Sequence, residues 1–213
     1  MLLPADTLPF RKPHCRRKFN RTKPNSSIAE NRIKREGSGL SYPCVSKEQL
    51  EWLKEDVIAS GKPTIILTHH PVRPGGYEKG IENYDEVRQV ISQLNQDKKR
   101  IILFLCGHTH LDGLGWMDDI PQLDINSISC VWMGHEYLYK NYDDETEKNY
   151  PYISSVAPYQ GPVFACITLS PDIIDVKGYS SDYVGPTPYE LGLPMDDRFY
   201  ECTPSVKDRR IGR

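Results

Sequence analysis

Histidine is the residue type in this sequence best suited to chemistry, and four of its six copies fall in two short motifs. His69 and His70 stand directly before Pro71, and the second motif reads Gly107-His108-Thr109-His110. Neutral imidazole is a common ligand for Zn, Mn and Fe. A lone histidine is more often a hydrogen-bonded structural residue, but two such motifs together predict a metal site.

Two short apolar runs lead into these motifs. Residues 64–68 (TIILT) precede His69, and residues 100–105 (RIILFL) precede Gly107. Both runs predict strands that are buried on both faces, as in a parallel sheet. Open α/β sheets form their sites beyond the carboxyl ends of strands, which is where these motifs fall. In an extended segment His108 and His110 would point the same way and converge on one region.

Two helices are expected around these strands, which gives an α/β order of helix, strand, helix, strand. Ser46 and Gln49 form a capping box at the start of the first helix, and Gly61 would end it. Tyr84 to Asn95 predicts the second helix from its apolar spacing. Further strands are expected near residues 123–129, 163–169 and 173–179, with a turn at residues 170–172. Residues 180–213 predict extended surface structure.

The two histidine motifs resemble those of the calcineurin-like metallophosphoesterase superfamily, and residues 46–54 resemble the helix before its first histidine motif. The resemblance covers roughly residues 41–213. It implies the later half of a four-layer α/β/β/α sandwich that hydrolyses phosphate mono- or diesters with two divalent ions, Mn, Fe or Zn. By this resemblance His69 and His108 bind one metal, His110 binds the other, and His70 is a metal or substrate neighbour.

Three motifs that the resemblance implies upstream of His69 are absent. Residues 1–68 contain no Asp-x-His, no Gly-Asp and no Asn-His, so no catalytic residue is identifiable. Two cations without bridging anions would repel each other, and we expect no dinuclear centre on this chain alone. We therefore expect a truncated or frameshifted, inactive copy whose unpaired sheet edges favour self-association. The alternative is a non-catalytic binding or interaction protein that retains the half-fold.

Other polar residues are weaker candidates for the site. Asn126 and His135 could be metal or substrate neighbours, although a structural role is about as well supported. Four aspartates after the second motif could orient ligands through hydrogen bonds or could be simple loop carboxylates; they are Asp112, Asp118, Asp119 and Asp124. A tyrosine-rich stretch could line a substrate cleft or pack beneath a loop: Tyr137, Tyr139, Tyr142, Tyr150 and Tyr152.

Charge divides the chain near residue 40. Residues 1–40 contain ten Lys and Arg against three acidic residues, whereas the rest contains 17 basic and 26 acidic residues. The first part predicts a basic, disordered or non-native leader, and residues 41–213 predict the phosphoesterase domain. A basic arm could contact nucleic acid, but nothing presents its charges on a helix or beside aromatic rings, so this partner is not favoured.

Composition excludes several classes of protein. No apolar run is long enough to span a bilayer, and the first residues do not predict a secretory signal. The six cysteines form no C-x-x-C pair, which favours free thiols over a metal knuckle or a disulfide framework. These features leave the compartment, the substrate and the identity of the metal open.

Overall fold

The computed structural model describes residues 32–34, 41–73, 80–194 and 202–213. The chain divides into two units, residues 1–30 and residues 31–213. The first unit lies outside the described residues, so the following description concerns the second unit alone. The basic leader expected over residues 1–40 also lies outside them, except for residues 32–34, and both its disorder and the division near residue 40 stay predictions.

Helices α1 (Lys47–Ser60) and α2 (Tyr84–Asn95) form where the sequence predicted them. Ser46 caps α1 by accepting a hydrogen bond from the backbone N–H of Gln49, whose side chain accepts one from the N–H of Ser46. Gly61 ends the helix in the left-handed conformation, with φ of 60°, which glycine adopts without a steric penalty. The apolar stripe of α2 is buried as expected and comprises Val87, Val90, Ile91 and Leu94.

The central sheet contains β3 (Thr64–Leu67), β4 (Ile101–Cys106), β5 (Gly113–Met117) and β6 (Ile120–Asp124). Its order is β3-β4-β6-β5, with parallel pairing from β3 to β6 and antiparallel pairing between β6 and β5. The strand expected over residues 123–129 was misplaced: the chain turns tightly at Asp118, whose φ is 54°, and β6 ends at Asp124. The hairpin partner β5 was not predicted.

A second sheet is built from β9 (Phe164–Leu169), β10 (Ile173–Tyr179) and β11 (Arg209–Gly212). All its pairings are antiparallel, in the order β11-β10-β9. The β9–β10 hairpin confirms the sequence prediction. The expectation that residues 180–213 form only surface structure was wrong, because β11 pairs with β10 and three apolar residues of its segment are buried: Cys202, Val206 and Ile211.

Shorter elements complete the described residues. Strands β1 (Arg32–Lys34) and β2 (Ser41–Pro43) form an antiparallel pair, as do β7 (Cys130–Trp132) and β8 (Val156–Pro158). Helix α3 (Asp144–Asn149) and a 3-10 turn (Ile153–Ser155) lie between β7 and β8 in sequence. No helix in the described part of the chain is both long and apolar enough to cross a membrane. The five cysteines of that part are free thiols, as expected.

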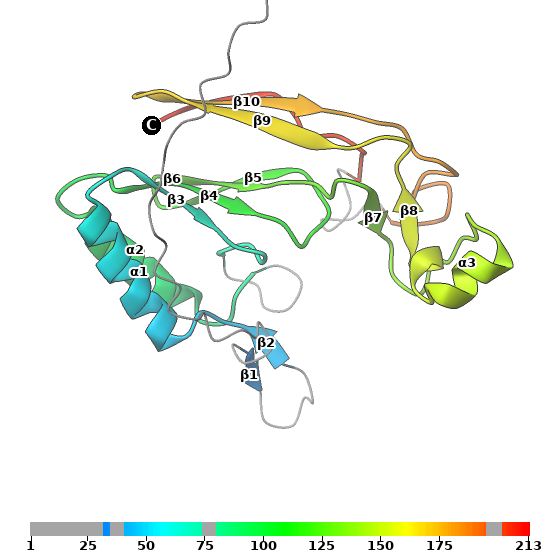
Figure 1. The fold of residues 1–213 in the computed structure, drawn as a ribbon, viewed down its shortest axis with the longest axis horizontal. Coiled ribbons are helices and arrows are strands. Elements are labelled where there is room, and N and C mark those ends of the chain that lie inside the picture. Colours follow the sequence, from blue (N-terminus) through cyan, green and yellow to red (C-terminus); the bar gives the residue numbers. More distant parts are fainter. Residues whose placement is uncertain (1–31, 35–40, 74–79, 195–201) are drawn as a thin grey trace, which may run out of the picture. The chain divides into compact units, whose positions relative to one another are not determined.

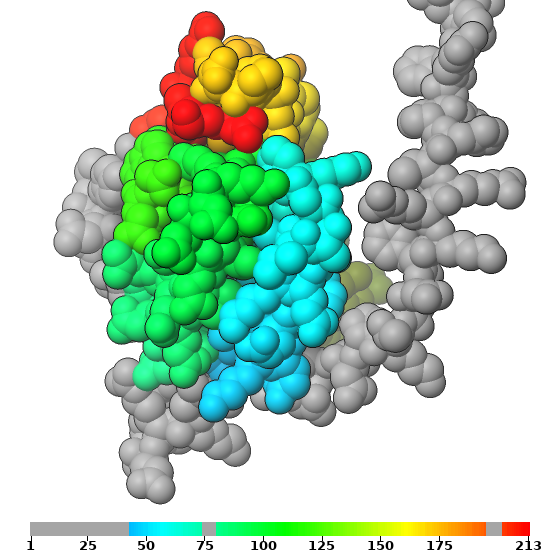
Figure 2. Space-filling view, turned by 90° about the vertical axis from the view of Figure 1, so that its left-hand side faces the viewer, coloured from blue at the N-terminus to red at the C-terminus, as the bar shows by residue number. Residues whose placement is uncertain are grey.

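The elements stack in three layers, with α1 and α2 on one face of the central sheet and the second sheet over its other face (Figure 1). Figure 2 shows α1, in blue to cyan, beside α2, in green. Side chains of β4 divide between the two cores: Phe104 packs with the helices, whereas Leu103 packs in the same cluster as Ile174 and Val176 of β10. The α/β class is confirmed, and the fourth layer implied by the resemblance is not seen among the described residues.

Burial differs between the two strands that precede the histidines. Strand β4 is buried almost throughout, as predicted. Strand β3 is only half-buried, and Leu67 is 76% exposed. The expectation that β3 is covered on both faces was therefore wrong. The physical reason is its position: among the described strands β3 pairs with β4 alone and forms the edge of the sheet.

Candidate metal centre

Both histidine motifs lie at one edge of the central sheet because β3 and β4 are parallel neighbours. Their register pairs Ile66 with Phe104 and Leu67 with Leu105. Hydrogen bonds continue this pairing past the strand ends: the N–H of Thr68 donates to the carbonyl of Leu105 at 3.0 Å, and the N–H of Gly107 donates to the carbonyl of His69 at 3.0 Å. These bonds bring the two motifs together, as the sequence predicted.

Three imidazoles meet at this edge. Nδ1 of His108 and Nε2 of His69 share a hydrogen bond of 3.2 Å. The ring of His70 lies 3.9 Å from the ring of His108, measured between centroids, and 5.1 Å from the ring of His69. Each residue offers one nitrogen within 4.8 Å of the nitrogens of the other two. We call His69, His70 and His108 the histidine triad.

The donor set of the triad, and the spacing of its His69–His108 pair, fit a transition-metal ion. Zinc binds imidazole nitrogen at about 2.0–2.1 Å with tetrahedral angles, which places two ligand nitrogens roughly 3.3 Å apart. The 3.2 Å between the nitrogens of His69 and His108 matches that spacing. His69 is exposed to solvent, whereas His70 and His108 are less exposed. The triad could therefore hold a divalent ion, and His69 is its solvent-exposed member.

His110 lies outside the triad and makes a different contact. Its Nδ1 lies 3.1 Å from the carbonyl oxygen of Cys130 on β7. A carbonyl can only accept, so Nδ1 carries the proton and Nε2 keeps its lone pair, the arrangement usual for metal-binding histidines. Burial lowers the pKa of His110 below its ordinary value, the bond to Cys130 opposes this change, and the nearby His69 adds to it. His110 is thus poised as a neutral imidazole.

The backbone of the second motif is not extended, contrary to expectation. His108 has φ of 71° and His110 has φ of 54°, which places both in the left-handed region. For residues other than glycine this conformation costs roughly 1–2 kcal/mol each and persists only where the surroundings hold it. The extended backbone assumed for this motif is therefore wrong: His108 contacts His69, and His110 contacts the carbonyl of Cys130. The expectation that His108 and His110 converge on one region stays a prediction.

The aspartates that follow the second motif are all ion-paired elsewhere. Asp118 pairs with Arg88 and Asp119 pairs with Lys99, on the surface. Asp112 and Asp124 are buried, and their partners are Arg209 and Arg73, respectively. Burial raises the pKa of Asp124, against the opposing effect of Arg73. Within the described ranges, the group of side chains close enough to share one ion consists of imidazoles alone.

The other two candidates occupy separate surroundings. Asn126 is buried, and its amide donates to the carbonyls of Thr203 and Ser205 while its oxygen accepts from the hydroxyl of Tyr159. These three bonds account for its burial without a ligand. His135 is exposed and shares a hydrogen bond of 3.2 Å with Ser155. Its role as a metal or substrate neighbour, like that of Asn126, stays a prediction.

The tyrosine-rich stretch contributes an exposed aromatic cluster. The ring of His135 packs edge-on against Trp132 at 5.8 Å and lies 5.6 Å from the ring of Tyr152. Sequence analysis missed Trp132, although it lies only two residues from Cys130 on β7. It also missed Arg73, which pairs with Asp124. The only signal in the sequence was its place, three residues after His70.

Comparison with known proteins gives little further information. No family model matches the sequence, and no curated protein matches it. Among solved structures, the chain is similar to a dimetal phosphatase from Danio rerio, with 17% identity and a TM-score of 0.37. The match covers 64% of this chain and 36% of that chain, so the matched part spans about a third of the solved protein.

Proposed function

We propose that this chain carries the histidine-bearing later half of a metal-dependent phosphoesterase that hydrolyses phosphate mono- or diesters. The observation that supports this function most directly is the 3.2 Å approach of His69 and His108 beside His70, at the ends of two parallel strands. Three imidazoles at such a position form a ligand set for Zn, Mn or Fe. The spacing of the two histidine motifs in the sequence supports the same reaction class.

The chain's own residues would bind and orient the ion. His69, His70 and His108 would hold it, and His110 is kept in the tautomer that leaves Nε2 available. A bound divalent ion supplies two effects in phosphoester hydrolysis: it makes water more acidic, and it neutralises charge on the phosphoryl oxygens. The buried aspartates stay with their arginines and are not offered to the ion.

We further propose that the two-metal reaction is incomplete on this chain. A pair of divalent ions needs bridging anionic ligands, and the triad contains none. The sequence before His69 also lacks the Asp-x-His, Gly-Asp and Asn-His motifs that the family resemblance implies. We therefore expect one bound ion and no efficient turnover in the isolated chain.

The all-imidazole composition of the triad supports a second candidate, a non-catalytic binding protein that retains the fold and one metal. The two candidates differ in what the bound ion can do. A phosphoesterase half would regain turnover when the missing carboxylates are supplied by another polypeptide. A binding protein would hold its ion and remain inactive.

Metal binding and turnover should be measured on the same preparation. Calorimetric titration with Zn²⁺ or Mn²⁺ should show binding to the wild-type chain and none to His69→Ala or His108→Ala. Hydrolysis of an aryl phosphate by the loaded chain should stay near the rate of the free metal. Wild-type titrations without binding would overturn the metal assignment. Turnover far above the free-metal rate would instead overturn the proposed incompleteness and exclude the binding protein.

A further inference from the structure

The loop between β4 and β5, residues 107–112, carries both histidines of the second motif, and we call it the histidine loop. Its two left-handed residues, His108 and His110, require the surroundings to hold the backbone. At the near end the N–H of Gly107 donates to the carbonyl of His69. The far end is Asp112, which precedes β5. Between these ends His110 contacts Cys130, and the contacts of Asp112 fix the far end of the loop.

Asp112 is clamped by a segment that comes almost a hundred residues later. Arg209 donates from Nη1 to Oδ1 at 2.9 Å and from Nη2 to Oδ2 at 2.6 Å. The backbone N–H of Lys207 donates to Oδ2 at 3.1 Å. The side chain of Asp112 is only 2% exposed and that of Arg209 is 12% exposed. Such a two-pronged, charged contact fixes direction as well as distance.

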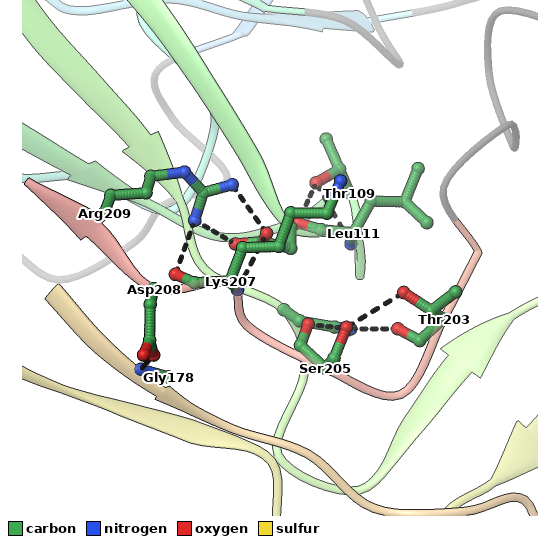
Figure 3. Close-up of polar contacts among 10 residues, drawn as sticks. Thr109, Leu111, Gly178, Thr203, Ser205, Lys207, Asp208 and Arg209 are labelled. Atoms are coloured by element: carbon green, nitrogen blue, oxygen red, sulfur yellow. Dashed lines mark hydrogen bonds and ion pairs between the residues drawn. The ribbon is translucent and has the colours of Figure 1, made fainter.

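The segment that supplies these donors is itself anchored. Figure 3 shows Lys207 and Arg209 beside the loop residues Thr109 and Leu111. Arg209 begins β11, which pairs with β10. Earlier in the segment, the carbonyls of Thr203 and Ser205 accept hydrogen bonds from the buried amide of Asn126. The clamp on Asp112 thus comes from a part of the fold that is held on both sides.

We propose that Asp112 and Arg209 are positioning residues of the metal site: their buried ion pair holds the far end of the histidine loop so that His108 stays opposite His69. This inference rests on the proposed metal-binding function. It assigns the two residues no contact with the ion. Asp112 lies two residues after His110 and four after His108, so a displaced Asp112 would relax the strained backbone on which both imidazoles depend.

The test is titration with Co²⁺, whose visible absorption reports the geometry of its ligands. Asp112→Asn paired with Arg209→Met removes both charges and leaves no isolated buried ion. Arg209→Lys keeps the charge and loses the fork that binds both oxygens. We expect the double variant to bind Co²⁺ roughly 10- to 100-fold more weakly, as loss of outer partners does at other metal sites. We expect the Co²⁺ affinity of Arg209→Lys to lie between that of the double variant and that of the wild type, and its absorption spectrum to differ from that of the wild type.

The matched control is Asp208→Asn, one residue before Arg209. It breaks an exposed ion pair with Lys177, at 2.6 Å, on the same sheet, and should leave affinity and spectrum unchanged. Wild-type affinity and spectrum in both the double variant and Arg209→Lys would overturn the positioning role, even if their unfolding midpoints fall. Should the double variant not fold, the spectrum of Arg209→Lys alone decides. Failure of the wild type to bind Co²⁺ would overturn the proposed function instead.

Discussion

At the scale of single residues, the geometry ranks the histidines differently from the family resemblance. The resemblance assigns ligands at His69, His108 and His110, whereas the structure places His70 in the triad with the first two. His70→Ala should therefore cost more metal affinity than the roughly 10- to 100-fold expected for loss of an outer partner, because it removes a direct ligand. His110→Ala should cost less affinity than His70→Ala, because the ring of His110 bonds to the carbonyl of Cys130 and lies outside the triad.

The measurement for this ranking is a competitive Zn²⁺ titration of both variants against a chelating dye. His135→Ala serves as the control, since its exposed ring contacts Trp132 and Tyr152 rather than the triad. Equal affinity of His70→Ala and the wild type would contradict the triad. A larger loss in His110→Ala would favour the ligand set of the resemblance.

A second residue-scale prediction concerns Cys202. Burial raises the pKa of this thiol from 9.0 to about 11. The folded state therefore holds its proton where the unfolded state loses it, so this group's contribution to stability is complete below pH 9 and is lost as the pH rises through about 11. Iodoacetamide at pH 9 should label the exposed Cys166 and spare Cys202, as peptide mass spectrometry would show. Equal labelling in the folded protein would contradict the burial.

At the scale of elements, the helices were predictable because their signals are local. The capping box of Ser46 and Gln49, the stop at Gly61 and the stripe on α2 each lie within a few residues of the element they define. Strand β11 depends on pairing with β10, more than thirty residues earlier, and its own sequence contains no alternation that would reveal it. Such partners are set by tertiary contacts, which local patterns do not encode.

The candidate site, too, was predictable from the sequence only in part. Strand ends that follow parallel neighbours must meet, so the proximity of His69 and His108 followed from the sequence. The left-handed backbone at His108 and His110 did not, because it is held by contacts with β7 and with Arg209. His70 lies beside His108, with 3.9 Å between ring centroids, and its role as a metal or substrate neighbour stays a prediction.

The start of α1 offers a direct test of a local signal. Ser46→Ala removes the side-chain acceptor for the N–H of Gln49 and should lower the free energy of unfolding by about 1 kcal/mol. Urea denaturation monitored by circular dichroism would measure the change. Lys47→Ala, at the exposed first residue of the helix, is the control and should stay within about 0.5 kcal/mol of the wild type. Equal midpoints for Ser46→Ala and the control would show that the cap contributes nothing measurable.

At the scale of the whole molecule, large apolar side chains remain exposed among the described residues, one of them at the edge of the central sheet. Leu67 at the end of β3 is 76% exposed, and Trp52 on α1 is 64% exposed. Among the strands that the structure describes, only β4 pairs with β3, so one side of its backbone is left without a sheet partner. An unpaired edge strand is a template for pairing with another chain. Self-association through this edge stays a prediction.

We expect the substitution Leu67→Lys to weaken the predicted self-association. Burying one leucine side chain contributes about 1.5–3 kcal/mol, and a lysine on an edge strand opposes pairing, so the dimer constant should weaken by roughly tenfold or more. Sedimentation velocity over a concentration series would measure it. Leu138→Lys is the matched control, because Leu138 is 60% exposed but lies outside any strand. Association that is unchanged by Leu67→Lys would show that β3 does not form the contact. Association that is lost equally in both variants would show that general surface hydrophobicity causes it.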